Sequence, residues 1–247
     1  MNKTITAVLL LALAAPAAAQ QKKSPGQEPK PKAAAPAPAP AKKPAPAAEA
    51  AETPEEKAIR ELKAWDSRLD SLEADFTQEV SFTEAGLKQS IEGKLQYVKP
   101  NLLRIEHIKP SRQLVVTDKA DIWIYKPEDK QVVKTAWEAW RKTQDQNFSG
   151  ILDFGNYSSL TARNETKVEG GKGGAPFTVT FTPRSGAAYT LKLTLSATDY
   201  FPSGAELSVD GTVIRTTLTS VTKNGEIDRK IFKFTPPKGT ETLEFKN

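Results

Sequence analysis

The chain of 247 residues contains no cysteine and only one histidine, His107. Without cysteine it has no disulfide, no thiolate site for zinc or an iron–sulfur cluster, and no cysteine nucleophile. One histidine leaves at most one base for a Ser-His-Asp triad and excludes a two-histidine metal site within one chain. We therefore predict no catalytic residues, no metal ligands and no cofactor, and we expect a protein that is not an enzyme.

The sequence also lacks an apolar run long enough to span a membrane. The apolar stretch at residues 5–15 holds about 10 residues, whereas a helical span needs about 20. Lys3 precedes this stretch and three alanines at 17–19 follow it, which is typical of a secretory signal peptide. We expect residues 1–19 to be cleaved off, with a retained signal anchor as the alternative. Gln20 stands where a lipidated cysteine would be, so no lipid anchor is expected.

Residues 20–54 lack aromatic and branched aliphatic side chains, and they contain 9 prolines and 11 alanines. Such a segment has almost nothing to bury, and its Ala-Pro pairs favour polyproline II. We therefore expect a disordered linker. It carries six lysines and three glutamates, so most of the formal net charge of +5 belongs to this linker and to Lys3.

The remaining residues, 55–247, are nearly neutral, with 28 basic and 27 acidic side chains. Nucleic-acid binding usually depends on a clustered basic face. The charge balance therefore argues against a nucleic-acid partner. The length of this part is sufficient for one domain with a substantial core.

The domain begins with a helix signal. Thr53 suits the N-cap, Pro54 suits the first helical position, and Glu56 completes a capping box. The pattern that follows predicts an amphipathic helix of about 20 residues. Its apolar side chains recur at three- and four-residue steps: Ala58, Ile59, Leu62, Trp65, Leu69, Leu72 and Phe76.

After the helix, alternating apolar and polar residues predict about a dozen short strands. Strands that follow one another with so few helices favour one large, strongly curved antiparallel sheet over a doubly wound α/β fold. The fold class is therefore mainly β with a few helices. The predicted strands are residues 76–82, 87–97, 102–108, 113–118, 122–125, 131–135, 161–168, 177–182, 189–195, 205–210, 213–221 and 230–234.

Residues 136–160 interrupt the strands with apolar residues at helical steps among glycine and serine. They predict one or two short helices that lie across the sheet, either as a plain cover of the core or as a movable lid. The first run of strands is rich in aromatic residues, which form either an ordinary core or the wall of an internal hydrophobic cavity. His107 shares a strand face with Leu103 and Ile105, which favours a core or rim position over a catalytic one.

Several motifs together resemble the periplasmic outer-membrane lipoprotein carrier family. They are Phe76-Thr77-Gln78, Gly93 among alternating apolar residues, Lys99-Pro100-Asn101-Leu102-Leu103-Arg104, Gln113-Leu114-Val115-Val116-Thr117-Asp118, Ile122-Trp123-Ile124-Tyr125-Lys126-Pro127 and Phe232-Lys233-Phe234-Thr235-Pro236-Pro237-Lys238-Gly239. The resemblance covers residues 55–247. It implies an incomplete antiparallel β-barrel of about 11 strands, with helices that cover a hydrophobic cavity.

The resemblance also implies a function and a location. A member of this family is expected in the periplasm, where its cavity shields the acyl chains of lipoproteins. It takes them from an inner-membrane ABC-type release complex and delivers them to an outer-membrane acceptor. We expect a monomer. Two alternatives remain: a binding or sensing module of the same fold in the cell envelope, and a carrier of another amphiphile such as a glycolipid.

The surplus of apolar side chains, together with the family resemblance, implies roles for individual residues. The expected acyl-chain cavity is lined by Phe76, Val80, Phe82, Leu95, Tyr97, Leu103, Ile105, Trp123 and Tyr125. The expected lid residues are Trp137, Trp140, Ile151, Leu152 and Phe154. The family usually has an arginine before the proline at position 100, and that arginine latches the lid. Here Lys99 takes this place without arginine's planar fork, and Arg104 is the alternative latch.

Overall fold

A computed structural model describes residues 52–118, 120–137, 139, 155–186 and 189–245. They belong to a compact unit that spans Ala50–Asn247. The expected signal peptide and almost all of the expected linker therefore lie outside the described residues.

Helix α1 runs from Pro54 to Arg68, and its capping box is formed as the sequence predicts. The Thr53 side chain accepts the Glu56 N–H, and the Glu56 carboxylate accepts the Thr53 N–H. The helix has 15 residues and is therefore shorter than predicted. Leu72 and Phe76 belong to strand β1, because a four-residue spacing fits the two-residue period of a strand as well as the helical period.

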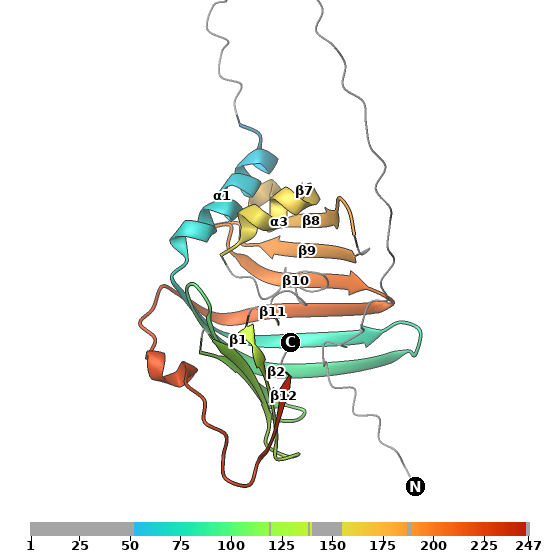
Figure 1. Cartoon of the computed structure of the whole chain (residues 1–247). Helices are drawn as coiled ribbons and strands as arrows, with labels where there is room; N and C mark the ends of the chain where they lie inside the picture. Colours follow the sequence, from blue (N-terminus) through green and yellow to red (C-terminus); the bar gives the residue numbers. More distant parts are fainter. Residues whose placement is uncertain (1–51, 119, 138, 140–154, 187–188, 246–247) are drawn as a thin grey trace, which may run out of the picture. The chain divides into compact units, whose positions relative to one another are not determined.

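In the described residues, twelve strands form one open sheet in the order β12-β6-β5-β4-β3-β2-β1-β11-β10-β9-β8-β7. Neighbours pair antiparallel except for β12 and β6, which are parallel. Strand β11 pairs with β1. This pairing joins the meander of β1 to β6 and the meander of β7 to β11 into one sheet (Figure 1). The mainly β, curved and unclosed sheet predicted from the sequence is confirmed. The strands are β1 Ser71–Phe82, β2 Leu87–Val98, β3 Leu102–Lys109, β4 Gln113–Thr117, β5 Asp121–Lys126, β6 Gln131–Ala136, β7 Asn164–Gly170, β8 Phe177–Pro183, β9 Tyr189–Leu195, β10 Pro202–Val209, β11 Thr212–Lys223 and β12 Glu241–Phe245.

Helices α1 and α3 (Tyr157–Arg163) pack on the same face of this sheet, which we call the inner face. Figure 1 shows both helices beside β7 and β8. Trp65 anchors α1: its indole N–H donates to the Asp199 carbonyl oxygen (3.0 Å), and its ring meets Phe201 edge-on. The predicted strand 161–168 starts too early, because α3 continues to Arg163 and β7 begins at Asn164.

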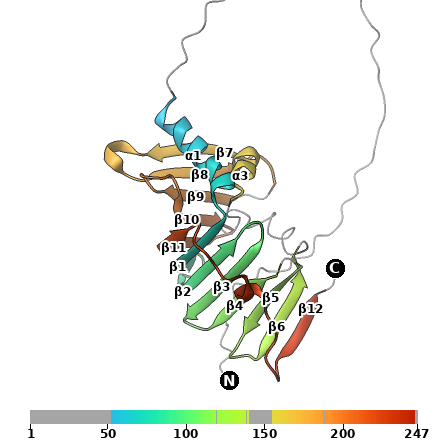
Figure 2. The ribbon, with the colours of Figure 1, turned by 90° about the vertical axis from the view of Figure 1, so that its left-hand side faces the viewer.

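The C-terminal segment crosses the opposite face, which we call the outer face (Figure 2). Its short 3-10 helix η2, Arg229–Phe232, buries Phe232 against Val98 and Leu102. The strand predicted at 230–234 is therefore wrong. The chain instead forms β12, which the sequence did not predict, at the far edge of the sheet.

Candidate functional site

A continuous apolar surface covers the inner face from one meander to the other. Residues paired directly across neighbouring strands project from the same face of a sheet. The pairs Ala74–Leu95, Leu95–Ile105 and Ile105–Val115 extend this surface across β1 to β4. Further along, Val115 pairs with Ile124 and Ile124 with Val133. On the other side of β1, the same face continues through Val80, Ile214, Leu207, Leu191 and Phe181.

Seven of the nine predicted cavity residues lie on this inner face: Phe76, Val80, Phe82, Leu95, Tyr97, Leu103 and Ile105. Six of them are buried, and Phe82 is half-buried near the tip of the β1–β2 hairpin. They form one cluster with Ala58, Leu62 and Trp65 of α1. The prediction was confined to the first meander, whereas the inner face of β8 to β11 contributes equally apolar side chains.

Trp123 and Tyr125 do not lie with the other seven. Trp123 pairs with Val116, and Val116 pairs with Arg104, so Trp123 projects from the outer face. The rings of Trp123 and Tyr125 lie 5.8 and 5.6 Å from the Phe234 ring, centroid to centroid. The structure therefore corrects the strand phase assumed for these two residues. Their rings contact Phe234 of the C-terminal segment, on the face opposite to the other seven residues.

Lys99, the expected latch, contacts helix α1. Its ammonium group donates to the backbone carbonyl oxygen of Asp66 in the last turn of the helix (2.7 Å). A cation in this position satisfies a free carbonyl and interacts favourably with the C-terminal end of the helix dipole. Arg104, the alternative latch, lies on the outer face and donates to the Ile231 carbonyl oxygen (3.3 Å). Arg104 therefore contacts the C-terminal segment.

The side chain of Asp66 connects α1 to α3, a role that sequence reasoning missed. One carboxylate oxygen accepts the N–H of Tyr157 (2.5 Å), and the other accepts the N–H of Ser158 (2.8 Å). These N–H groups lie in the first turn of α3, where the helix itself supplies no acceptor and a negative charge is favourable. No sequence signal could have shown it, because the two segments lie 91 residues apart.

Of the five expected lid residues, Trp137 lies within the described part of the chain. Trp137 is buried directly after β6, where its backbone N–H donates to the Ala120 carbonyl oxygen (2.9 Å). The other four expected lid residues, Trp140, Ile151, Leu152 and Phe154, lie outside the described residues. The role of these residues as a lid stays a prediction.

No three His, Asp or Glu side chains in the described part of the chain come together in a group that could hold a metal ion. His107 is half-buried on the inner face, with its ring centroid 5.8 Å from that of Phe76. Burial lowers the pKa of His107 below its ordinary value of 6.5, so the imidazole is neutral near pH 7.

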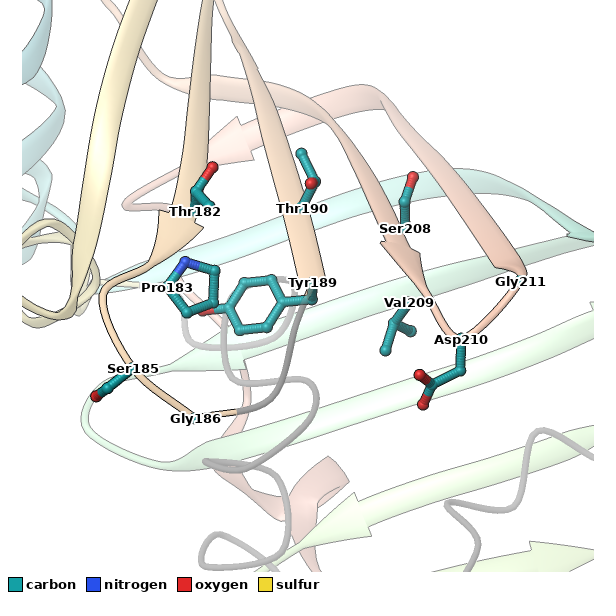
Figure 3. A pocket seen from close by; sticks show the side chains of 10 residues that line it. All are labelled: Thr182, Pro183, Ser185, Gly186, Tyr189, Thr190, Ser208, Val209, Asp210 and Gly211. Carbon is teal, nitrogen blue, oxygen red and sulfur yellow. The ribbon is translucent and has the colours of Figure 1, made fainter.

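An open hollow of about 510 Å³ lies at the ends of β8, β9 and β10 (Figure 3). Hydroxyl side chains and glycines make up much of its lining. The hydroxyl of Tyr189 is already bonded to Asn164 Oδ1 (3.0 Å). The lining residues are Thr182, Pro183, Ser185, Gly186, Tyr189, Thr190, Ser208, Val209, Asp210 and Gly211.

Comparisons with known proteins give one consistent result. Residues 67–235 match the family described as outer membrane lipoprotein carrier protein LolA. An outer-membrane lipoprotein carrier protein from Neisseria meningitidis serogroup B is 26% identical over 197 residues, which cover 75% of this chain and 86% of the relative. A protein of the same name from Serratia proteamaculans is 28% identical over 182 residues, which cover 74% and 85%.

The solved structures that are similar to this chain share little of its sequence. A LolA superfamily protein from Nitrosomonas europaea superimposes with a TM-score of 0.40 and 11% identity, over 74% of this chain and 99% of that one. An uncharacterized conserved protein from Thermus thermophilus gives a TM-score of 0.47 and 12% identity, over 76% and 98%.

Proposed function

This chain belongs to the outer membrane lipoprotein carrier family, LolA, and from that premise we propose that it carries lipoproteins through the periplasm. In this proposal the inner face shields the acyl chains of the cargo. The protein collects its cargo from an inner-membrane ABC-type release complex and delivers it to an outer-membrane acceptor. The names of the curated relatives support the carrier role.

The apolar inner face is the observation that carries the proposal. Val115, Ile124 and Val133 are only half-buried there, although they continue the row of the buried Leu95 and Ile105. Each acyl methylene that is removed from water contributes roughly 0.8 kcal/mol, so several chains amount to tens of kcal/mol. A half-buried apolar wall next to a packed core provides the surface that such chains need.

The proposal includes the arrangement of the whole chain. Residues 1–19 act as a cleaved signal peptide, residues 20–54 as a linker, and residues 55–247 as the carrier domain. None of the helices in the described part of the chain has the length and apolar character that a membrane span requires. The domain acts as a monomeric carrier without enzymatic activity, and nucleic acid is not among its partners.

The proposal can be tested by lipoprotein release from spheroplasts. The protein without residues 1–19 is added to spheroplasts that retain newly made lipoproteins, and the supernatant is analysed for a soluble complex. Val115→Asn changes the inner face, and Leu114→Asn is a matched control, because these neighbours are both half-buried and project from opposite faces. We expect release that Val115→Asn reduces and Leu114→Asn leaves intact.

Native mass spectrometry of the protein isolated from its own periplasm identifies the ligand. A bound triacylated lipoprotein supports the proposal. A bound glycolipid in its place would show a carrier of another amphiphile, and a ligand-free protein that captures an envelope partner would show a binding or sensing module. Either of these results contradicts the proposed cargo.

A further inference from the structure

Four polar side chains form a row across the inner face of β3 to β6. His107 pairs with Gln113, and Lys126 pairs with Gln131. Gln113 precedes Leu114 and Lys126 follows Tyr125 in the antiparallel Leu114–Tyr125 pair, which continues the row from β4 to β5. All four are half-buried. We call them the polar row.

The polar row borders the half-buried apolar wall. One step along each strand, on the same face, lie Ile105, Val115, Ile124 and Val133. On its other side are the turns at 110–112 and 127–130, which are mostly exposed. The inner face of β3 to β6 therefore changes from apolar to polar within two residues, close to solvent. An amphiphile has the same change from apolar to polar where its tail joins its head.

Three side chains of the polar row have donor and acceptor groups that no other described residue binds. Gln113, Lys126 and Gln131 make no side-chain hydrogen bond or ion pair with another residue in the described part of the chain. Gln78 provides a contrast on the same face, because its amide donates to the Thr216 hydroxyl (3.0 Å). Water can reach the polar ends of these side chains, and a ligand that accepts their hydrogen bonds would take the place of that water.

The side chains of the polar row select a type of ligand. Two amide NH2 groups and one ammonium group are donors, and the inner-face positions of β3 to β6 include no carboxylate. A positively charged head is therefore disfavoured. Phosphate sites usually combine arginines or several backbone N–H groups, which the polar row lacks. Neutral carbonyl oxygens fit this donor set better.

We propose that the polar row binds the ester and amide carbonyl oxygens that join the acyl chains to the polar end of the cargo. This inference rests on the proposed function and adds a subsite to it. The apolar wall holds the tails, while Gln113, Lys126 and Gln131 donate to the linkage and fix how deeply the tails enter. Pure hydrocarbon contacts cannot fix that depth, because the hydrophobic effect is not directional.

The test compares two probes on the full mature chain. One is a synthetic peptide with a diacylglyceryl-modified cysteine, which has ester carbonyls. The other is N-phenyl-1-naphthylamine, which is apolar and has none. The variant combines Gln113→Leu, Lys126→Met and Gln131→Leu. Lys94→Met is the charge-matched control, because Lys94 is exposed and pairs with Glu106 on the outer face.

We expect the triple variant to bind the lipopeptide at least about tenfold more weakly, as the loss of three hydrogen bonds predicts. Naphthylamine binding should stay within about twofold, and Lys94→Met should change neither. Equal weakening for both probes, or none for the lipopeptide, would overturn the inference. If the triple variant does not fold, Lys126→Met alone should weaken lipopeptide binding about three- to fivefold, and an unchanged affinity would overturn the inference equally.

Two further outcomes separate the possible errors. A wild-type protein that fails to bind the lipopeptide contradicts the proposed function itself, independently of the polar row. Vesicles that contain phosphatidylglycerol provide the third arm. If the triple variant loses binding to these vesicles but keeps its lipopeptide affinity, the polar row recognises a phosphate and the carbonyl assignment is overturned.

Discussion

The ammonium group of Lys99 donates a hydrogen bond to the Asp66 carbonyl oxygen at 2.7 Å, which fixes the end of β2 to the last turn of α1. The same Asp66 holds the start of α3 with its carboxylate. Asp66 of α1 therefore contacts Lys99 at the end of β2 through its backbone, and it contacts α3 through its side chain.

Replacing Lys99 should loosen the end of α1. In Lys99→Met the Asp66 carbonyl oxygen loses its donor and the helix dipole loses a favourable charge, so we expect a loss of about 1–2 kcal/mol in the free energy of unfolding. Lys99→Arg should keep most of the stability, since a donor remains. Urea unfolding measures the effect, with Lys94→Met as the exposed control. A Lys99→Met protein as stable as this control would contradict the assigned contact.

Replacing Asp66 should release α3. Asp66→Ala leaves the N–H groups of Tyr157 and Ser158 without their acceptor, and we expect a cost of about 2–4 kcal/mol. Hydrogen exchange should quicken most in residues 157–163. Asp70→Ala is the matched control, because Asp70 is exposed just beyond the same helix. Unchanged protection of α3 in Asp66→Ala would show that other contacts hold this helix.

Gly93→Ala tests the close packing of the inner face. A Cβ atom at Gly93 would lie 2.5 Å from Phe76 Cζ and would also meet the backbone carbonyl oxygen of Glu106. We expect destabilisation of about 1–3 kcal/mol from overpacking. Gly204→Ala is the control, because its nearest contact would be 3.4 Å, to the Thr216 carbonyl oxygen. The melting temperatures of the two variants measure the difference in stability. Equal melting temperatures would argue against close packing at Gly93.

His107 should make stability depend on pH. Burial lowers the pKa of His107 in the folded protein, so the unfolded chain binds more protons as the pH falls through about 6.5. The contribution is fully present above that pH and is lost below it. His107→Gln should therefore lose less stability than the wild type between pH 7.5 and pH 5. Urea unfolding at both values measures the difference, and an equal or larger loss in His107→Gln contradicts the sign.

The fold class was accessible from the sequence because most of its strands have one polar and one apolar face. Strand β9, for example, alternates strictly, and its bounds were predicted correctly at residues 189–195. The start of α1 was equally clear, since a capping box is a local signal. Its end was not, because Leu72 and Phe76 satisfy the helical and the strand period at once.

The face of Trp123 and Tyr125 could not be derived from the sequence. Four consecutive apolar residues, Ile122 to Tyr125, carry no two-residue period. Apolar side chains suit both faces of β5, because its inner face continues the apolar wall and its outer face packs against Phe234. Phe234 arrives from more than 100 residues away. Tertiary contacts of that kind leave no local pattern.

Crosslinking at two adjacent residues of β5 tests the central claim, that the inner face binds acyl chains. Ile124 projects from the inner face and Trp123 from the outer face. Each is replaced in turn by the photoreactive residue benzoylphenylalanine, and the protein is irradiated with the diacylglyceryl lipopeptide. We expect a crosslink to the acyl chain from position 124 and none from position 123. A crosslink from position 123 alone, or from neither position while the lipopeptide is bound, would contradict it.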